Sequence, residues 1–308
     1  MVLLLLQSLP PTATSHDSDQ SMPVVRPVRV APTKLSGVWI LGGSLGAMDE
    51  HKGAIQAPDT FRDVQHGGLL LAVESAVPLL VVPRSPSYVG LLRGASDFAA
   101  PNGSLHLERL PDAAPEGAQT PCLVARQPSL RRRSPRNWTL EANVLFLGTP
   151  HFGRHWQTIV AKTGFNLSAA DPSNAALPIL AAKLSPARRF VLQVWVDVES
   201  GPPILVTAQS VHQALPDTWY HLVMVSNGGT LDFYVNGGFE LRLRTGGRLA
   251  LPTRSTDGDL AFGCGMHQGV PADTCSCLLS EVRAAEQALT PEQWLWRRRD
   301  GYHSRGHG

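Results

Sequence analysis

The feature that most constrains the fold is a series of short segments, rich in alternating or β-branched apolar residues, that recur along the second half of the chain. Gly, Pro, Asn and Asp separate these segments. Short strands at regular spacing, with turn residues between them, are typical of β-sandwiches and β-barrels. The sequence therefore predicts an all-β protein. The segments are residues 138–147, 158–162, 189–198, 204–208, 219–226, 231–236 and 260–264.

The clearest local signal is Asn227-Gly228 between two strong strand segments. Asn-Gly tolerates the positive φ angles of a tight hairpin, so residues 219–226 and 231–236 are predicted to pair antiparallel. The first segment is apolar on both faces, which predicts a central strand. In the second, Leu231, Phe233 and Val235 share one face and are predicted to face the core.

A single helical turn is predicted near the end of the chain. Thr290 supplies an N-cap, Pro291 suits the first helical position and Glu292 places an acid in the first turn. The turn is expected over about residues 291–296.

Three motifs carry a family resemblance. They are Trp138-Thr-Leu-Glu-Ala-Asn-Val144, the pair of segments 215–223 and 228–237, and the pair 279–283 and 288–292. In order and spacing they resemble the laminin-G-like jelly rolls of the concanavalin-A-like lectin and glucanase superfamily. The resemblance covers about residues 103–296 and implies an antiparallel two-sheet β-sandwich. Asn143 departs from the family pattern, which usually has an aromatic residue there.

The chain divides by composition into a leader, a folded unit and a tail. Residues 1–34 lack any lasting hydrophobic period and are expected to form a flexible leader. Its short apolar run, Val2–Leu6, makes a targeting segment possible there. Residues 35–298 are expected to form one laminin-G-like sandwich, to which residues 35–101 add extra strands. Residues 299–308 are a flexible basic tail.

Charge and hydropathy exclude some classes of partner. A net charge of +2 does not indicate a nucleic-acid partner. The chain has no apolar run near the roughly 20 residues of a membrane-spanning helix, so no membrane span is expected.

A polar and aromatic sheet face is the first candidate binding site, because sugar rings are held by an aromatic platform with amide and carboxylate groups beside it. The alternative is an ordinary solvated face whose strands belong to different sheets. Trp195 then has two uses, as an exposed ligand platform or as a packed second-layer residue. The ligand-binding candidates are Gln193, Trp195, Asp197, Asp232 and Tyr234, with Glu141 and Asn143 on the same predicted face.

Catalysis is not expected. Glycosidases need two carboxyl groups across the scissile bond, and the retaining glucanases that the resemblance brings in carry them in a Glu-x-Asp run with a third carboxylate. Asp197 and Glu199 are the nearest approach, and they lack that third partner. The chain is therefore predicted not to be an enzyme, with a glycoside hydrolase as the least favoured alternative.

Metal sites are weakly indicated, and no cofactor is expected. Cys264, His267, Cys275 and Cys277 are the ligand types of a zinc site, but their spacing matches no standard finger. A disulfide from Cys264 to Cys275 or Cys277, or buried free thiols, are the alternatives. Calcium would have only the weak pair Asp257 and Asp259.

Three glycosylation sequons, at Asn102, Asn137 and Asn166, slightly favour a secreted or cell-surface location over an intracellular complex.

The leading hypothesis is a non-catalytic recognition or adhesion module that binds a glycan or a protein surface. The alternative is a structural subunit of an intracellular assembly, which uses a degenerate lectin-like sandwich for docking.

Overall fold

The computed structural model describes fifteen stretches of the chain. They are residues 37–40, 55–56, 60–62, 70–74, 80–82, 104–107, 121–125, 136–150, 152–162, 164, 178–198, 201–245, 248–250, 258–267 and 270–295. The predicted leader, the basic tail, Glu199 and Asp257 lie outside the described residues.

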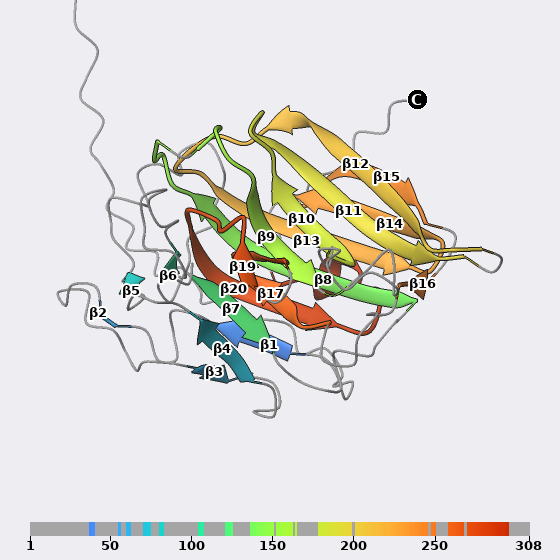
Figure 1. Ribbon diagram of the computed structural model, residues 1–308, viewed down its shortest axis with the longest axis horizontal. Coiled ribbons are helices and arrows are strands. Elements are labelled where there is room, and N and C mark those ends of the chain that lie inside the picture. The colour runs from blue at the N-terminus through green and yellow to red at the C-terminus, as the bar shows by residue number, and fades with distance from the viewer. Residues whose placement is uncertain are drawn as a thin grey trace, which may run out of the picture.

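Two nine-stranded antiparallel sheets pack against each other (Figure 1). The first sheet has the order β15-β14-β13-β8-β20-β6-β5-β2, with β1 pairing β20 at one side. Its strands are β15 (Gly238–Arg244), β14 (Thr230–Val235), β13 (Trp219–Asn227), β8 (Asn137–Phe146), β20 (Cys277–Ala285), β6 (Ser104–Leu107), β5 (Leu80–Val82), β2 (Ile55–Gln56) and β1 (Gly37–Ile40).

The second sheet has the order β12-β11-β10-β9-β17-β7-β4-β3, with β16 pairing the far end of β11. Its strands are β12 (Ile204–Gln213), β11 (Arg189–Asp197), β10 (Leu180–Leu184), β9 (Gln157–Lys162), β17 (Leu260–Phe262), β7 (Cys122–Ala125), β4 (Leu70–Glu74), β3 (Thr60–Arg62) and β16 (Arg248–Leu249). A small ribbon of β18 (Gly265–His267) and β19 (Val270–Ala272) lies beside it. The predicted all-β sandwich is confirmed.

The core lies between the sheets and is centred on aromatic rings from both. Phe146 of β8 lies 6.2 Å from Phe190 of β11 and 6.1 Å from Tyr220 of β13, between ring centroids. Phe190 also contacts Phe233 of β14 at 5.8 Å. Alternate residues of each strand supply this core, as the two-residue period requires. The predicted inward set on β14 is confirmed, since Leu231 and Phe233 are buried in the core and Val235 packs against it.

The β13–β14 hairpin turns where the sequence predicts. Gly228 has φ of +86°, in the region that disfavours side chains. The Asn227 carboxamide oxygen accepts hydrogen bonds from the backbone N–H of Gly229 and of Thr230, at 3.1 and 2.9 Å. β13 lies between β8 and β14, so the predicted central strand is confirmed.

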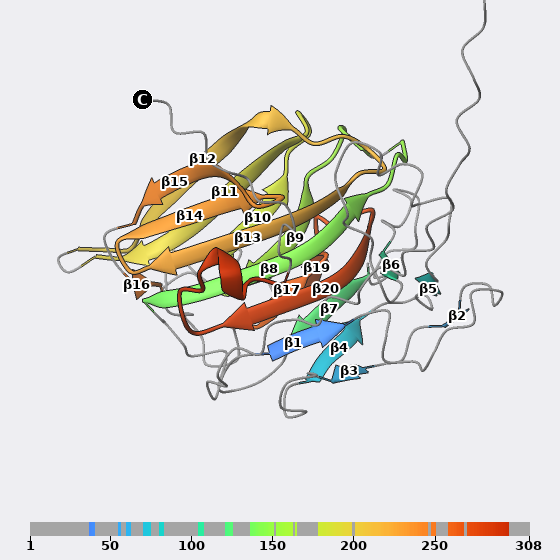
Figure 2. The same cartoon turned by 180° about the vertical axis from the view of Figure 1, so that it is seen from behind.

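After β20 the chain turns back over the outer face of the first sheet. We call residues 286–295 the C-terminal strap. Figure 2 shows its 3-10 turn, η1 (Pro291–Gln293), beside β8 and β20. The Thr290 N–H donates to the Gln293 carboxamide oxygen at 3.0 Å, which is the capping-box contact at the start of the predicted helical turn. Trp296 lies outside the described residues.

Strands from the first third of the chain extend both sheets. β1 pairs with β20, and β5 and β2 continue the first sheet beyond β6. β4 and β3 continue the second sheet beyond β7. Among the described residues, no helix has the length and apolar character to cross a membrane.

The hairpin gives a test of the fold. Replacing Gly228 with Val should lower the free energy of unfolding by about 1 kcal/mol or more, because a β-branched residue resists positive φ. Replacing Gly229 with Val is the matched control, since a Cβ there would have only the Asn227 carboxamide oxygen within 4 Å, at 3.8 Å. Urea unfolding of both variants makes the comparison. Equal losses would place the strained turn elsewhere.

Candidate functional site

The structure divides the predicted binding residues between the two sheets. Gln193, Trp195 and Asp197 lie on β11 of the second sheet, whereas Asp232 and Tyr234 lie on β14 of the first. They do not form one face, so the prediction of a single polar and aromatic site is wrong. Residue alternation fixes which side chains of a strand point together, but it does not specify the sheet that the strand joins.

Trp195 is packed and not displayed. Its relative exposure is 8%, and it belongs to the main core cluster together with Leu249 and Ala250 of the neighbouring segment. The Ala250 N–H donates to the Trp195 carbonyl at 2.9 Å, which holds that segment against β11. Of the two uses predicted for Trp195, the structure shows the packed position. The prediction of an exposed ligand platform is wrong.

Asp232 and Tyr234, the part of the predicted site on the first sheet, lie beside two residues of the neighbouring strand β15, Phe239 and Arg242. We call Asp232, Tyr234, Phe239 and Arg242 the β14–β15 patch. Arg242 binds the Asp232 carboxylate through two hydrogen bonds, Nε to Oδ1 at 2.6 Å and Nη2 to Oδ2 at 2.8 Å. The Arg242 side chain is 55% exposed, whereas Asp232 is buried beneath it. A buried carboxylate therefore holds an exposed guanidinium in a fixed orientation.

Aromatic rings form the other half of the patch. Phe239 is 56% exposed and meets Tyr234 edge to face, with ring centroids 5.7 Å apart. The Arg242 guanidinium lies over the Phe239 ring at 5.7 Å from its centroid. Burial raises the pKa of the Tyr234 phenol, and Asp232 adds to that shift. The Tyr234 hydroxyl is therefore a neutral group at physiological pH.

Sequence reasoning missed Phe239 and Arg242, although a signal was present. Asn236-Gly237 is a second turn, directly after the predicted strand 231–236. A hairpin there pairs Tyr234 with Phe239, as observed, whereas the pairing of Asp232 with Arg242 also requires a register shift between Phe233 and Tyr234 that the turn does not predict.

The row of aromatic rings continues inward from the patch to the strap. Trp294 lies 4.8 Å from Tyr234 and 6.3 Å from His221, between ring centroids. Its indole is buried in a small apolar cluster with Val223, Ala285 and Leu289. The strap thus forms the inner wall of the β14–β15 patch.

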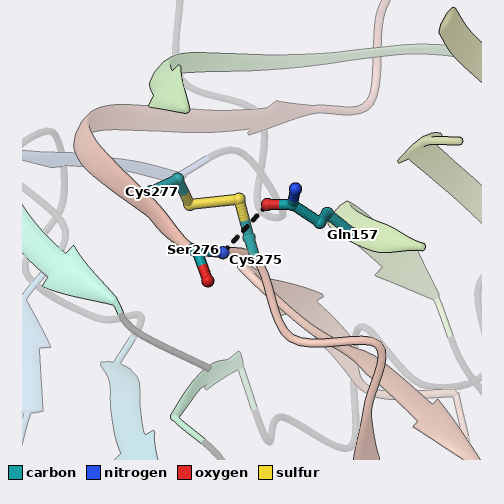
Figure 3. Close-up of a disulfide and its surroundings, with 4 residues drawn as sticks. All are labelled: Gln157, Cys275, Ser276 and Cys277. Carbon is teal, nitrogen blue, oxygen red and sulfur yellow. Dashed lines mark hydrogen bonds between the residues drawn. A yellow bond between two sulfur atoms is a disulfide. The ribbon is translucent and has the colours of Figure 1, made fainter. Parts of the chain in front are cut away.

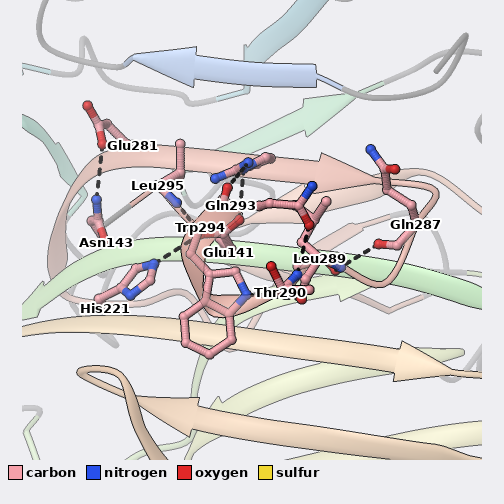
Figure 4. Close-up of polar contacts among 12 residues, drawn as sticks. Glu141, Asn143, His221, Glu281, Gln287, Leu289, Thr290, Gln293, Trp294 and Leu295 are labelled. Carbon is pink, nitrogen blue, oxygen red and sulfur yellow. Dashed lines mark hydrogen bonds and ion pairs between the residues drawn. The ribbon is translucent and has the colours of Figure 1, made fainter. Parts of the chain in front are cut away.

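Beneath the strap lies a buried ionic cluster (Figure 4). Glu141 of β8, His221 of β13 and Arg283 of β20 are all fully buried. One Glu141 oxygen lies 2.8 Å from Arg283 Nε, and the other is hydrogen-bonded to His221 Nε2 at 3.1 Å. The second oxygen also accepts the Leu295 backbone N–H at 2.7 Å. Three groups thereby contact the buried carboxylate, of which His221 and the Leu295 N–H are hydrogen-bonded to it and Arg283 forms an ion pair without hydrogen-bond geometry.

The strap is tied to the sheet by further hydrogen bonds. Arg283 Nη1 donates to the Gln293 carbonyl at 2.8 Å. The Thr139 hydroxyl donates to the Gln287 carbonyl at 2.8 Å and accepts the Leu289 N–H at 2.9 Å. Polar side chains on β8 and β20 therefore bind strap backbone, as an extended peptide would be bound.

Glu281 is the second carboxylate of this face. Its Oε2 accepts a hydrogen bond from Asn143 Nδ2 at 3.2 Å. Burial raises the pKa of Glu281 to about 7, Glu141 adds to the rise and Arg283 opposes it. Burial also lowers the pKa of Arg283, against the pull of Glu141 and Glu281. Both carboxylates are engaged with protein groups.

All four cysteines are in disulfides, and the predicted pairing is wrong. Cys122 of β7 is joined to Cys264, with Cα atoms 5.3 Å apart, and Cys275 is joined to Cys277 (Figure 3). Cys264 pairs with a residue 142 positions away, a contact that only the β7–β17 pairing creates. The sulfur atoms are thus unavailable as thiolate ligands, which contradicts the zinc candidate; the His267 side chain lies outside the described residues.

The calcium candidate is reduced to one residue, because Asp257 lies outside the described part of the chain. Asp259 is buried at the start of β17. Burial lowers the pKa of Lys162 to about 8, while the charges of Asp259 and Glu286 oppose the shift. Lys162 Nζ donates to the Gly258 carbonyl at 2.9 Å, so an ammonium already provides positive charge at this rim. Within the described residues there is no group of three or more His, Cys, Asp or Glu side chains that could hold a metal ion.

Of the three sequons, the structure describes one. Asn137 is exposed at the start of β8, and the Thr139 of its sequon is buried under the strap. Asn102 and Asn166 lie outside the described residues.

Comparison with known proteins identifies one matching family and several structural neighbours. A family model described as the concanavalin A-like lectin/glucanases superfamily matches residues 132–293. A search of curated proteins found no match. The neighbours include the binding domain of botulinum neurotoxin serotype G, with 9% identity, a TM-score of 0.46 and coverage of 82% of this chain and 48% of that one.

Two further neighbours act on or bind sialic acids. A Trypanosoma rangeli sialidase in complex with a difluoro-KDN compound has 13% identity and a TM-score of 0.44, with coverage of 83% of this chain and 31% of that one. The CBM40 domain of a Ruminococcus gnavus sialidase, bound to α2,3-sialyllactose, has 8% identity and a TM-score of 0.41, with coverage of 53% of this chain and 82% of that one. The chain spans about half or less of the length of the first two neighbours.

One tryptophan variant and one phenylalanine variant distinguish a core position from a surface position. Replacing Trp195 with Ala should lower the free energy of unfolding by roughly 3–5 kcal/mol, because a large cavity replaces a buried indole. Replacing Phe239 with Ala should cost far less, because that ring is mostly exposed. Thermal melts of both variants test this contrast, and a Trp195 variant as stable as the parent would contradict the packed position.

The disulfides should differ in their effect on stability. Removing the Cys122–Cys264 bond with a double Ala substitution should cost roughly 2–5 kcal/mol, because the bond closes a long loop in the unfolded chain. The same change at Cys275 and Cys277 should cost less by this entropic route, since only one residue separates them. Guanidinium unfolding of the two double variants measures the difference. The opposite ranking would show that loop closure is not the main contribution.

Proposed function

This chain belongs to the concanavalin A-like lectin/glucanases superfamily, and from that premise we propose that it is a non-catalytic recognition module. The observation that carries the proposal is the β14–β15 patch. There, the buried Asp232 carboxylate orients the exposed guanidinium, and the half-buried Tyr234 ring contacts the exposed Phe239 ring. Binding energy is concentrated in such rigid aromatic and arginine groups, because little side-chain entropy is lost on contact.

A glycan is the ligand that fits this patch best. The apolar face of a sugar ring can stack on Phe239, while its hydroxyl groups meet Arg242 and the Tyr234 hydroxyl. Asp232 neutralises Arg242, so the patch has hydrogen-bonding capacity without a strong net charge. These features support recognition of neutral polar surfaces over that of nucleic acid.

The way the described carboxylates are used supports the non-catalytic part of this proposal. Glycosidases need two carboxyl groups that both reach the glycosidic bond. In the buried cluster, Glu141 is bound by Arg283 and His221, and Glu281 accepts from Asn143. Asp197 lies on the other sheet, and its predicted partner Glu199 is outside the described residues. We therefore assign these carboxylates to structure.

An extracellular or cell-surface location fits the same proposal. All four cysteines are in disulfides, which persist in oxidising compartments. The exposed Asn137 is an accessible glycosylation acceptor in such a compartment.

Docking to a protein is the second candidate function, favoured by the edge strand of the second sheet, β12, which lies beside β15 of the first sheet. Edge strand β12 exposes Ile204, Leu205 and Val211. The ten residues Ile204–Gln213 contain no Lys, Arg, Asp, Glu or Pro, the residues that usually protect a sheet edge from pairing. This edge suits the structural-subunit alternative better than the β14–β15 patch does.

A glycan array with the full chain tests the proposal. Bound glycans should be lost, with affinity at least tenfold lower, when Phe239 is replaced with Ala, because the stacking platform is removed. Val211→Ala on β12 is the control and should keep both binding and melting temperature. Glycan binding that survives Phe239→Ala would reject the patch. Polysaccharide cleavage that is lost in Asp197→Asn would instead support a hydrolase.

A further inference from the structure

Strand β12 ends the second sheet, and its outer edge has no strand partner among the residues that the structure describes. Figure 1 shows β12 at the rim of the sandwich, with β15 of the first sheet beside it. The two strands are joined near the end of β12, where the His212 N–H donates to Glu240 Oε1 at 3.4 Å. Ile204 and Leu205, at the start of β12, are each 46% exposed. Within the described residues, the first part of this edge is therefore open to a further strand.

The hydrogen bonds of β11 show which backbone groups of β12 point outward. The Trp195 N–H and carbonyl both bond to residues at β10 and β16, at 2.7 and 2.9 Å, and so point away from β12. Leu205 is opposite Trp195 in the antiparallel ladder, and in such a pair the groups of both residues point away from each other. The pattern repeats every two residues. Leu205, Thr207 and Gln209 therefore present their N–H and C=O groups at the open edge.

Charge distinguishes β12 from the edge strand beside it. The seven residues of β15 include Glu240, Arg242 and Arg244, and charged side chains oppose pairing at a sheet edge. The ten residues of β12 include no Lys, Arg, Asp or Glu. A charged partner strand would find no counter-charge there, whereas a second copy of β12 brings no charge that needs one. The uncharged edge therefore suits a second copy of the same strand.

One antiparallel register makes β12 complementary to itself. Matching all three outward-facing residues places Leu205 opposite Gln209 and each Thr207 opposite its own copy, with a two-fold axis between the threonines. A Thr–Thr pair across strands is favourable. On the core side, the same register places Val206 opposite Ala208, a larger side chain beside a smaller one. Both are only partly buried against the core, so a second copy would complete their burial.

We propose that β12 is a dimer interface, where two copies of this chain pair antiparallel through Leu205, Thr207 and Gln209. Each opposed pair exchanges two backbone hydrogen bonds. The two second sheets become one continuous sheet, and the apolar core-side residues of β12 are covered at the junction. The interface itself does not depend on the proposed glycan function.

Pairing through β12 also sets how the two β14–β15 patches are displayed, a step that rests on the proposed glycan function. The two-fold axis of an antiparallel strand pair is normal to the sheet, so each face of the second sheet continues into the same face of the other copy. Both first sheets then lie on one side of the dimer, and both patches point the same way. Neighbouring glycans on a surface would be bound together, which raises avidity without any new contact.

Sedimentation equilibrium of the full chain tests the interface. The parent chain should reach twice its own mass as its concentration rises from about 1 µM to about 1 mM. Thr207→Lys should weaken dimerisation at least tenfold, because like charges would face each other across the axis. Leu215→Lys is the matched control. It adds the same charge at an exposed position beyond the end of β12 and should leave dimerisation unchanged.

Opposite charges at the axis identify the partner as a second copy. Thr207→Glu alone should also weaken dimerisation, whereas an equal mixture of the Thr207→Lys and Thr207→Glu chains should restore it, because Lys then faces Glu.

A parent chain that stays monomeric up to about 1 mM would overturn the proposal, even if every variant failed to fold. A dimer that Thr207→Lys leaves intact would place the interface elsewhere, and a mixture without recovery would reject the two-fold register. No glycan enters these measurements, so failure of the dimer and failure of the proposed glycan function are distinguishable.

Discussion

A single buried carboxylate, that of Glu141, organises the outer face of the first sheet. It joins β8 to β20 through Arg283, β8 to β13 through His221, and the sheet to the strap through the Leu295 N–H. A guanidinium left without its carboxylate in such a place destabilises a protein by about 3–5 kcal/mol. The strap and the cluster therefore stabilise each other. The strap covers the ion pair and supplies two of its hydrogen-bonding partners, and the cluster in turn binds the strap backbone.

The sheet itself was readable from local signals. Alternation of apolar residues marked the strands, Asn227-Gly228 marked the hairpin, and the two apolar faces of residues 219–226 marked a central strand. These features depend on neighbours in sequence, through the two-residue period of a strand and the positive φ of a turn. The superfamily motifs then predicted the pairing of two sheets, which periodicity alone does not provide.

Contacts between distant residues could not be read in this way. Glu141 was placed on a polar face, but its partners His221 and Arg283 lie 80 and 142 positions further along the chain, and only the order β13-β8-β20 brings them together. The same holds for Cys122 and Cys264, and for Trp195, whose burial depends on the segment at Leu249. The available clue was Arg283 itself, a charged residue between Val282 and Ala284 in a largely apolar strand, where a buried guanidinium needs a partner.

The β14–β15 patch and the strap share one aromatic side chain, so a ligand on the patch and the docking of the strap are linked thermodynamically. Tyr234 contacts Phe239 on the open side and Trp294 on the strap side. A ligand that stacks on the Phe239–Tyr234 pair favours whichever Tyr234 position suits it, and Trp294 fixes that position only while the strap is docked. Linkage is reciprocal, so a ligand that binds the docked form more tightly stabilises the docked strap by the same free energy. Ligand affinity and the protection of the strap amides from hydrogen exchange would then vary together, whereas an unlinked patch would bind its ligand equally well with the strap docked or undocked.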